Sequence, residues 1–286
     1  MKLNNKVALV SGSSMGIGKA IAIELASQGS RVILNGRDGH VLFAAEMELK
    51  ALGYDVTACI ADVRYPEQCQ ELIACAINTY RQLDILVNNA AVSSRGSVEK
   101  MATGNIQTLS DTNYTGAAYL SKYAIPHLRK TKGHLIFINS AGGFRGMPYN
   151  SAYSASKVAQ AALADALRIE LYNDGIHVGV TFVGFTENDP KKTILDVDGT
   201  WVYLPKRTNI KLAKPQTVAK SICHMIDTRT TVATLTNLGH LAGFTTRYLP
   251  RLSNWLLWFK RDQIKEQFTM IGGEKAVKNI PLRNLP

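Results

Sequence analysis

Short apolar runs alternate with longer segments of helical periodicity through the first 190 residues of this 286-residue chain. Runs rich in Val, Ile and Leu are typical of parallel strands, because helices cover both faces of a parallel sheet. The predicted strands are Lys6–Val10, Arg31–Asn35, Val56–Ile60, Ile85–Asn88, His134–Asn139 and His177–Phe182. The helical segments between them lie near 16–28, 39–52, 66–81, 112–130 and 151–173. This alternation predicts an α/β fold of right-handed βαβ units with a doubly wound parallel sheet.

The alternation ends near residue 184. Residues 184–215 are polar and basic with scattered Gly and Pro, and we expect a long loop or a short-helix insertion there. A helix near 215–227 and a β-rich run, Thr230–Leu235, then provide a further strand. We therefore predict a single domain over residues 1–240, followed by a basic, tryptophan-rich helical extension over residues 241–286.

The net charge of +11 is concentrated in the last third of the chain. Residues 1–190 hold 17 basic and 16 acidic side chains, whereas residues 191–286 hold 16 and 6. Such an excess suits a polyanionic cofactor, an anionic membrane or a nucleic acid. A hydrophobic content of 46% provides a sizeable core and excludes a disordered protein. No stretch approaches the roughly 18 consecutive apolar residues of a transmembrane helix.

Cysteine usage and the N-terminus favour an intracellular protein. The sequence begins MKLNNKVALVSGSS and lacks the apolar segment of a signal peptide. The four cysteines form no CxxC pair, and the six histidines show no ligand clustering. We expect free thiols at all four cysteines, no metal site and a cytoplasmic location. The cysteines are Cys59, Cys69, Cys75 and Cys223.

A glycine-rich turn, SGSSMGIGK at residues 11–19, follows the first predicted strand. Glycines at such a turn let the backbone approach a pyrophosphate, and the next helix offers free N–H groups and its positive dipole end. The spacing differs from G-x-G-x-x-G, while Ser13 and Ala20 exclude a Walker P-loop. An ordinary βα turn remains the alternative, but the position favours dinucleotide binding by a Rossmann-type sheet. The expected cofactor contacts are Gly12, Ser14, Met15, Gly16, Ile17 and Gly18.

The end of the second predicted strand bears on which cofactor is bound. An acidic residue there would hydrogen-bond a ribose 2′-hydroxyl and favour NAD(H). This chain has a neutral residue followed by Arg37, whose guanidinium can pair with a 2′-phosphate, so the sequence favours NADP(H) over NAD(H). The alternative is a solvated arginine in a turn. Asp62, at the end of the third strand, is suited to the adenine amino group, and we include Val63 beside it in the cofactor site.

A tyrosine, a lysine and a serine form a candidate catalytic group. Tyr153 and Lys157 lie at i and i+4 on one predicted helix, and Ser140 ends a predicted strand. A phenol with a pKa near ~10 is a poor acid at neutral pH, but an ammonium within about 4–6 Å lowers that pKa by roughly 1–3 units. A lone Y-x-x-x-K is more often an exposed helix pair. The upstream serine and the glycine turn favour a proton donor at Tyr153 and a carbonyl-binding hydroxyl at Ser140.

These motifs together resemble the classical short-chain dehydrogenase/reductase (SDR) family over residues 5 to about 190. The matching residues are Gly12-x₃-Gly16-x-Gly18, Asp62, Asn88-Asn89-Ala90-Ala91, Asn113, Ser140 and Tyr153-x₃-Lys157. The resemblance implies a seven-stranded sheet, a nicotinamide cofactor, a homodimer or homotetramer, and an oxidoreductase that interconverts a carbonyl and a secondary alcohol. A non-catalytic nucleotide-sensing or scaffold protein on the same fold is the alternative.

The resemblance also implies roles for four catalytic residues. Asn113 would anchor a water that joins Lys157 to bulk solvent. Ser140 would orient the substrate carbonyl, and Tyr153 would donate or accept the proton. Lys157 would also hold the nicotinamide ribose. Four further cofactor contacts follow: Asn89, Ala90, Gly184 and Thr186.

Three positions depart from the family pattern. Ala91 replaces the last glycine of N-N-A-G, and Val183-Gly184 replaces the usual Pro-Gly after the sixth strand. Met15 stands where many NADP-preferring members carry a basic residue, which leaves Arg37 as the main reason to expect NADP(H).

Two regions beyond these motifs bear on the substrate and the partner. Residues 184–215 are expected to form the substrate wall, and their aromatics with those after Ser140 suggest a pocket for a hydrophobic ketone such as a steroid or an acyl chain. These aromatic and apolar residues are Phe144, Met147, Tyr149, Trp201 and Tyr203.

In the extension, apolar residues recur at helical spacing among cations. The apolar residues are Leu252, Trp255, Leu256, Leu257, Trp258 and Phe259, and the cations are Arg247, Arg251, Lys260 and Arg261. This pattern fits packing on the core, on a second subunit or over a lipophilic substrate pocket, or contact of 247–261 with a membrane surface. No nucleic-acid recognition motif accompanies the charge, so we expect no nucleic-acid partner.

Overall fold

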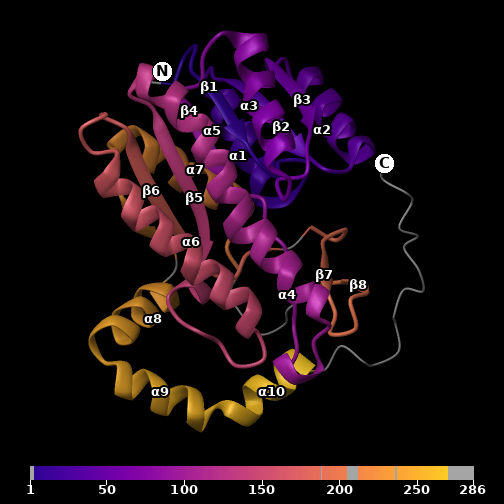
Figure 1. Ribbon diagram of the computed structural model, residues 1–286, viewed down its shortest axis with the longest axis vertical. Helices are drawn as coiled ribbons and strands as arrows, with labels where there is room; N and C mark the ends of the chain where they lie inside the picture. Colours follow the sequence, from indigo (N-terminus) through magenta and orange to yellow (C-terminus); the bar gives the residue numbers. More distant parts are fainter. Residues whose placement is uncertain (1–2, 188, 205–211, 236, 270–286) are drawn as a thin grey trace.

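A seven-stranded parallel sheet, in the order β3-β2-β1-β4-β5-β6-β9, forms the centre of the computed structural model (Figure 1). The structure describes residues 3–187, 189–204, 212–235 and 237–269. The strands are β1 (Val7–Val10), β2 (Arg31–Gly36), β3 (Val56–Ile60), β4 (Ile85–Asn88), β5 (His134–Ser140), β6 (His177–Val183) and β9 (Val232–Thr234). The predicted parallel sheet is therefore confirmed. The strand order reverses between β1 and β4, which is where sheets of this kind bind ligands.

Helices cover both faces of the sheet and create two apolar cores. One core contains residues of α1, α2 and α7, and the other contains residues of α3, α5 and α6. In β5, Phe137 lies in one core while its neighbours Ile136 and Ile138 lie in the other, because successive side chains point to opposite faces. These helices are α1 (Gly16–Ser27), α2 (Gly39–Ala51), α3 (Pro66–Tyr80), α5 (Gly116–Thr131), α6 (Ser151–Glu170) and α7 (Pro215–Thr228).

The helical segment after β4 begins earlier than the expected 112–130. A 3₁₀ turn, η1 (Val98–Lys100), precedes α4 (Thr103–Ser110), and a π-helical turn, η2 (Asp111–Thr115), joins α4 to α5. The polar composition of α4 hides its helical character from a hydrophobic-period analysis. A π turn inside a helix is rare and is frequently associated with a functional site.

Residues 184–215 contain a β-hairpin, which corrects our expectation of a long loop or a short-helix insertion. Its antiparallel strands are β7 (Thr193–Leu195) and β8 (Trp201–Tyr203). The hairpin is held from outside, because Leu195 N donates to Ser93 O at 2.9 Å and Ala102 N to Val197 O at 2.7 Å. Three-residue strands stabilised by such distant partners leave no periodicity in the sequence. Residues 188 and 205–211 of this segment lie outside the described part.

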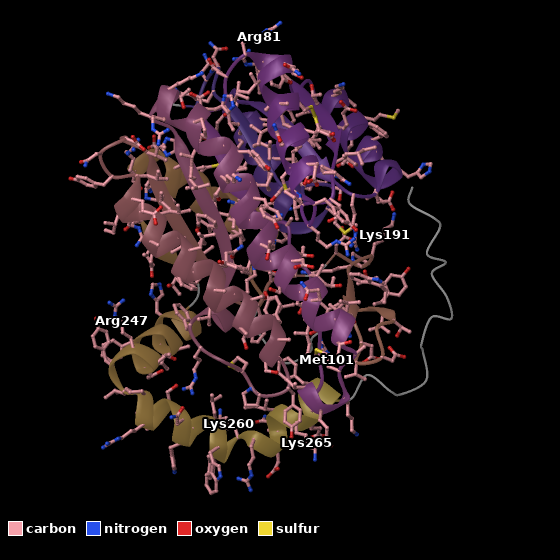
Figure 2. All side chains as sticks on the ribbon, in the orientation of Figure 1. Arg81, Met101, Lys191, Arg247, Lys260 and Lys265 are labelled. Carbon is pink, nitrogen blue, oxygen red and sulfur yellow. A yellow bond between two sulfur atoms is a disulfide. The ribbon has the colours of Figure 1, made fainter. Side chains whose placement is uncertain are left out.

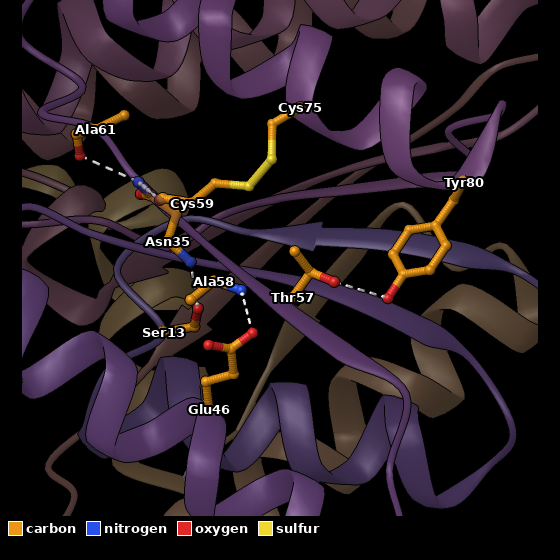
Figure 3. The surroundings of a disulfide bond; sticks show 9 residues. All are labelled: Ser13, Asn35, Glu46, Thr57, Ala58, Cys59, Ala61, Cys75 and Tyr80. Atoms are coloured by element: carbon orange, nitrogen blue, oxygen red, sulfur yellow. Dashed lines mark hydrogen bonds between the residues drawn. A yellow bond between two sulfur atoms is a disulfide. The ribbon is translucent and has the colours of Figure 1, made fainter.

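A disulfide joins Cys59 of β3 to Cys75 of α3, so the expectation that all four cysteines are free is wrong (Figure 3). Cys69 and Cys223 are free and buried. The crossover from β3 to α3 brings two residues that are 16 positions apart to a Cα–Cα distance of 6.8 Å. No short cysteine motif signals such a pair. The cytoplasmic location loses the support of four free thiols and stays a prediction.

Three consecutive helices form a curved strap at the lower edge of the molecule (Figure 1). They are α8 (Asn237–Tyr248), α9 (Pro250–Phe259) and α10 (Arg261–Thr269). Helical structure is thus confirmed for the described part of the extension, and residues 270–286 lie outside it. The domain boundary at residue 240 stays a prediction. Among the described residues, no helix combines the length and the hydropathy needed to cross a bilayer.

A buried carboxylate connects the starts of β1 and β4. Asp84 is 3% exposed and accepts hydrogen bonds from Val7 N, Lys6 Nζ and Gln82 Nε2 at 2.8 to 2.9 Å. We expect Asp84→Ala to lower the free energy of unfolding by about 2–4 kcal/mol, because a buried N–H loses its acceptor.

Asp165→Ala is the matched control, measured by urea denaturation. The Asp165–Arg168 pair has the same 2.9 Å separation as Asp84–Lys6, but its carboxylate is 65% exposed. This control should cost less than about 1 kcal/mol. Equal losses in the two variants would contradict the assigned role of Asp84.

Candidate active site

The glycine turn connects β1 to α1 at the carboxyl edge of the sheet. Gly12 and Gly16 have φ angles of 62° and 58°, which residues with side chains rarely adopt. A Cβ atom at Gly18 would lie 2.3 Å from the carbonyl oxygen of Gly12, so only glycine allows this close approach. A Cβ atom at Gly16 would meet no atom within 4 Å. The turn therefore leaves its backbone accessible on one side.

The first turn of α1 offers an anion site beside these glycines. Met15 is the N-cap residue and makes no side-chain capping bond, so the first N–H groups of the helix stay available. Ile17 packs against the core, and a Cβ atom at Gly36 of β2 would lie 3.4 Å from Ser14 Oγ. The uncapped helix start and the bare glycine backbone fit a dinucleotide pyrophosphate.

The residues after β4 hold the shape of the turn. Asn89 Nδ2 donates to the carbonyl oxygens of Ser11 and Gly12, each at 2.9 Å. Ala90 packs directly on the turn, because a Cβ atom at Gly12 would lie 2.9 Å from Ala90 Cα. Both residues thus border the expected cofactor position.

Two arginines and an aspartate gather where the adenosine end of a dinucleotide would lie. Asp62 accepts bonds from Arg64 Nε at 3.0 Å and Arg64 Nη2 at 2.6 Å. Burial raises the pKa of Asp62, but the hydrogen bonds and charge of Arg64 outweigh it and hold this pKa below its usual value. Arg37 is near enough to both residues to feel their charges, and Val63 is buried against Gly116 of α5. We did not single out Arg64 from the sequence, although a cation two residues after Asp62 is a readable signal.

Trp201 packs against the same small apolar cluster as Tyr153, and it also reaches Arg37. The guanidinium carbon of Arg37 is 4.9 Å from the centroid of the Trp201 ring, a cation–π geometry. Trp201 belongs to the hairpin that we predicted as substrate wall, so the hairpin reaches the adenosine end of the crevice. Its other strand carries Leu195, a member of the cluster against which both Trp201 and Tyr153 pack.

The structure brings Ser140 and Tyr153 together. Ser140 ends β5, and its Oγ accepts a bond from Gly142 N at 3.2 Å in the 3₁₀ turn η3 (Ala141–Gly143). A Cβ atom at Gly142 would lie 3.7 Å from Ser140 Oγ and 3.6 Å from Tyr153 Cε1. Gly142 therefore lies next to both the serine hydroxyl and the tyrosine ring, and a side chain there would contact both groups.

Lys157 lies one helical turn below Tyr153 in a buried polar network. Its Nζ donates to Ile138 O at 2.9 Å and to Gln160 Oε1 at 3.2 Å. Gln160 is fully buried, and its Nε2 donates to the backbone oxygen of Asn113 at 2.9 Å. Gln160 thus connects Lys157 to Asn113, the two residues that the family resemblance connects through a water. Sequence analysis missed Gln160, because an isolated glutamine in an alanine-rich helix carries no motif.

Both polar atoms of the Asn113 side chain are hydrogen-bonded to neighbouring residues. Val92 N donates to Asn113 Oδ1 at 2.8 Å, and Asn113 Nδ2 donates to Val92 O and to Ser156 Oγ, each at 2.9 Å. These bonds fix the π-helical turn against the strand-end segment, and they direct the backbone oxygen of Asn113 toward Gln160. The backbone oxygen of Asn113 is therefore connected to Lys157 through the Gln160 side chain.

Burial lowers the pKa of Lys157 into the neutral range. Desolvation, followed by the charge of Lys192, lowers the pKa of Lys157 to about 7. Lys192 lies just before β7, so the hairpin segment also contributes a cation that acts on the site. At neutral pH the amine can therefore both donate and accept a proton.

The segment after β6 is extended rather than turned. Thr186 is 8% exposed and pairs with Ala213 in a short parallel bridge, and Gly184 directly follows β6. Among the described residues, no group of three His, Cys, Asp or Glu side chains could hold a metal ion.

Substitutions at Gln160 should shift the pKa of Lys157 in opposite directions. We expect Gln160→Leu to lower this pKa below about 7, because the ammonium loses an acceptor. Gln160→Glu should raise it, because an adjacent carboxylate stabilises the ammonium. Heteronuclear NMR titration of the Lys157 side chain measures both shifts, with the exposed Gln216→Leu as control. Shifts of the same sign would show that Gln160 does not control the protonation of Lys157.

Curated proteins are similar in sequence to a large part of this chain. The family model described as short chain dehydrogenase matches residues 6–197. An 11-beta-hydroxysteroid dehydrogenase-like 4A of Arabidopsis thaliana is 35% identical over 65% of this chain and 63% of its own length. A putative ketoacyl reductase 1 of the granaticin polyketide synthase of Streptomyces violaceoruber is 38% identical over 71% of this chain and 76% of its own. The chain thus spans a little less than two thirds of the first of these relatives.

Solved structures share the fold. A metagenomic short-chain oxidoreductase in complex with NADP is 25% identical, with a TM-score of 0.67 over 82% of this chain and 97% of its own. A short chain dehydrogenase/reductase of Burkholderia phymatum in complex with NAD is 21% identical, with a TM-score of 0.76 over 90% and 96%. Because the family model covers more than half of the sequence, the chain belongs to the short-chain dehydrogenase/reductase family.

Proposed function

We propose that this protein is an NADP(H)-dependent oxidoreductase that interconverts a carbonyl and a secondary alcohol on a hydrophobic substrate. The observation that carries the proposal is that the Ser140 hydroxyl and the Tyr153 ring both lie next to Gly142, with the buried Lys157 one turn away. A bound nicotinamide would supply or accept the hydride. The side chains of the protein would then manage the oxygen and its proton.

The proton chemistry follows from the order of these side chains. In the reducing direction, Ser140 Oγ–H would donate to the carbonyl oxygen and stabilise the charge that develops there. The Tyr153 hydroxyl would transfer its proton to that oxygen and become a phenolate. A Lys157 ammonium with a pKa of about 7 can return the proton at neutral pH. In the oxidising direction the same groups would carry the proton the other way.

Three observations support a hydrophobic substrate. Phe144, directly after η3, stacks on Phe182 of β6 with ring centroids 4.1 Å apart. Tyr153 itself packs against the apolar cluster that includes Leu195 of the hairpin. Two relatives have names that refer to hydroxysteroid and ketoacyl substrates, both of which are largely apolar. The homodimer or homotetramer expected from the resemblance stays a prediction.

The preference for NADP(H) rests on Arg37. Its guanidinium lies at the adenosine end, where Arg64 is already paired with Asp62. A 2′-phosphate could form charge-assisted hydrogen bonds with Arg37, whose guanidinium also feels the charges of Asp62 and Asp38. The solved relatives bind both cofactors, one NADP and the other NAD, so the preference needs its own measurement.

Tyr153→Phe tests the catalytic proposal. We expect kcat for carbonyl reduction to fall by at least about 100-fold, because the proton donor is lost. NADPH binding, followed by fluorescence titration, should change little. Tyr172→Phe, at a position that is 78% exposed, is the control. Full activity in Tyr153→Phe would favour a nucleotide-binding scaffold instead.

Arg37→Ala tests the cofactor preference. We expect its affinity for NADPH to fall by about 10- to 100-fold, as for the loss of hydrogen bonds to a charged group, while its affinity for NADH stays nearly unchanged. Arg64→Ala should weaken NADPH binding less, because Arg64 is committed to Asp62. Equal losses for both cofactors in Arg37→Ala would contradict recognition of the 2′-phosphate.

A further inference from the structure

The strap of helices α8 to α10 exposes an unusual amount of apolar surface. Nine large apolar side chains between residues 241 and 259 are exposed, and Trp255, Trp258 and Phe259 have exposed fractions of 54%, 62% and 65%. The others are Leu241, Phe244, Tyr248, Leu249, Leu252 and Leu256. A contiguous apolar surface of this kind marks an interaction site.

Helix α9 faces the catalytic domain with its polar side. Ser253 is the buried residue of α9, and Arg145 Nη1 donates to its hydroxyl at 2.5 Å. Arg145 Nη2 also donates to Asn254 Oδ1. A helix that packs on its own core normally buries its apolar face, but α9 buries a serine and presents two tryptophans outward. This orientation argues against the interpretation that the apolar residues serve packing on the core.

Cations surround the exposed aromatics. The strap carries five cations against Asp262 and Glu266. These cations are Arg247, Arg251, Lys260, Arg261 and Lys265, of which Arg247, Lys260 and Lys265 are labelled along the strap in Figure 2. The guanidinium of Arg261 lies 4.7 Å from the centroid of the Trp258 ring. Tryptophan at headgroup depth with neighbouring cations is typical of helices that lie in a membrane interface.

The positive charge of the strap favours an anionic membrane over a second copy of the chain as its partner. A second copy of the chain would bring two positively charged straps together, and their repulsion would oppose that contact. An anionic lipid surface would neutralise the same charges and cover the aromatics. We propose that the strap, residues 237–269, binds the surface of an anionic membrane and inserts Trp255, Trp258 and Phe259 into its interfacial layer.

The anchors of the strap connect this surface to the crevice. A Cβ atom at Gly243 of α8 would lie 3.0 Å from the Phe144 ring, and Arg95 lies 5.9 Å from the centroid of Phe268 in α10. Phe144 and Arg145 follow the Ser140 strand, and Arg95 follows β4. Membrane binding would therefore place the mouth of the site near lipid, where a hydrophobic substrate dissolves. This consequence rests on the proposed function, but binding of the strap to membranes does not.

Vesicle binding by the purified full-length protein tests the proposal. Co-sedimentation should be at least about ten-fold stronger with vesicles of phosphatidylcholine and phosphatidylglycerol in equal parts than with phosphatidylcholine alone. Brominated lipid should quench the emission of Trp255 and Trp258 in a Trp201→Phe background. Lack of binding to the anionic vesicles would overturn the proposal.

Two sets of variants separate the contributions of the aromatic side chains and of the cations to vesicle binding. The triple variant Trp255→Ser, Trp258→Ser, Phe259→Ser should lose at least about ten-fold in vesicle binding, as should Arg247→Gln with Arg251→Gln on anionic vesicles. The control Phe43→Ser with Met47→Ser removes exposed apolar side chains from α2 and should bind normally. Unchanged thermal unfolding and unchanged reduction of a water-soluble ketone would show that the variants remain folded.

Sedimentation velocity tests the alternative that a second copy of the chain covers this face. If the triple variant dissociated an oligomer and the native protein ignored vesicles, the face would belong to a second copy and the proposal would be wrong. Vesicle binding that survives in Tyr153→Phe would support the membrane proposal even if the proposed catalytic function failed.

Discussion

The central sheet is buried on both faces, and this constraint decides where chemistry can occur. Strands β1 and β4 are buried along their whole length, so polar groups can gather only where the strands end. Four components of the candidate site lie at such ends: the glycine turn after β1, Arg37 after β2, Asn89 after β4 and Ser140 at the end of β5. The reversal of strand order between β1 and β4 opens the crevice among them.

The buried amide network behind Tyr153 is the second determinant. Burying a lysine to 2% exposure is costly unless its N–H groups find acceptors, and Ile138 O and Gln160 Oε1 accept from two of the three. The same burial brings the pKa of Lys157 to about 7, so the feature that stabilises the position also suits proton transfer. The π-helical turn at Asn113 completes this network, because it orients a backbone oxygen toward Gln160.

Most of the sheet and the site could be predicted because they depend on local patterns. Buried strands read as continuous apolar runs, and Gly12, Gly16, Gly18, Tyr153 and Lys157 occur at spacings that a single turn or helix defines. The rest depends on contacts between distant segments. The hairpin is held by hydrogen bonds to Ser93 and Ala102, and Cys59 reaches Cys75 only through a crossover. The role of Gln160 depends on its hydrogen bond to Asn113, which lies 47 residues away.

The sequence by itself determined the parallel sheet, the glycine turn and the Ser140, Tyr153 and Lys157 group, because periodicity and short spacing encode each of them. It also showed that the excess of positive charge lies in the last third of the chain. Only the tertiary structure decided what surrounds these elements: Trp201 over Arg37, Gln160 between Lys157 and Asn113, and the outward direction of Trp255 and Trp258. The spacing of apolar residues in α9 indicates an amphipathic helix, but which face turns inward depends on Arg145, a partner that helical periodicity cannot reveal.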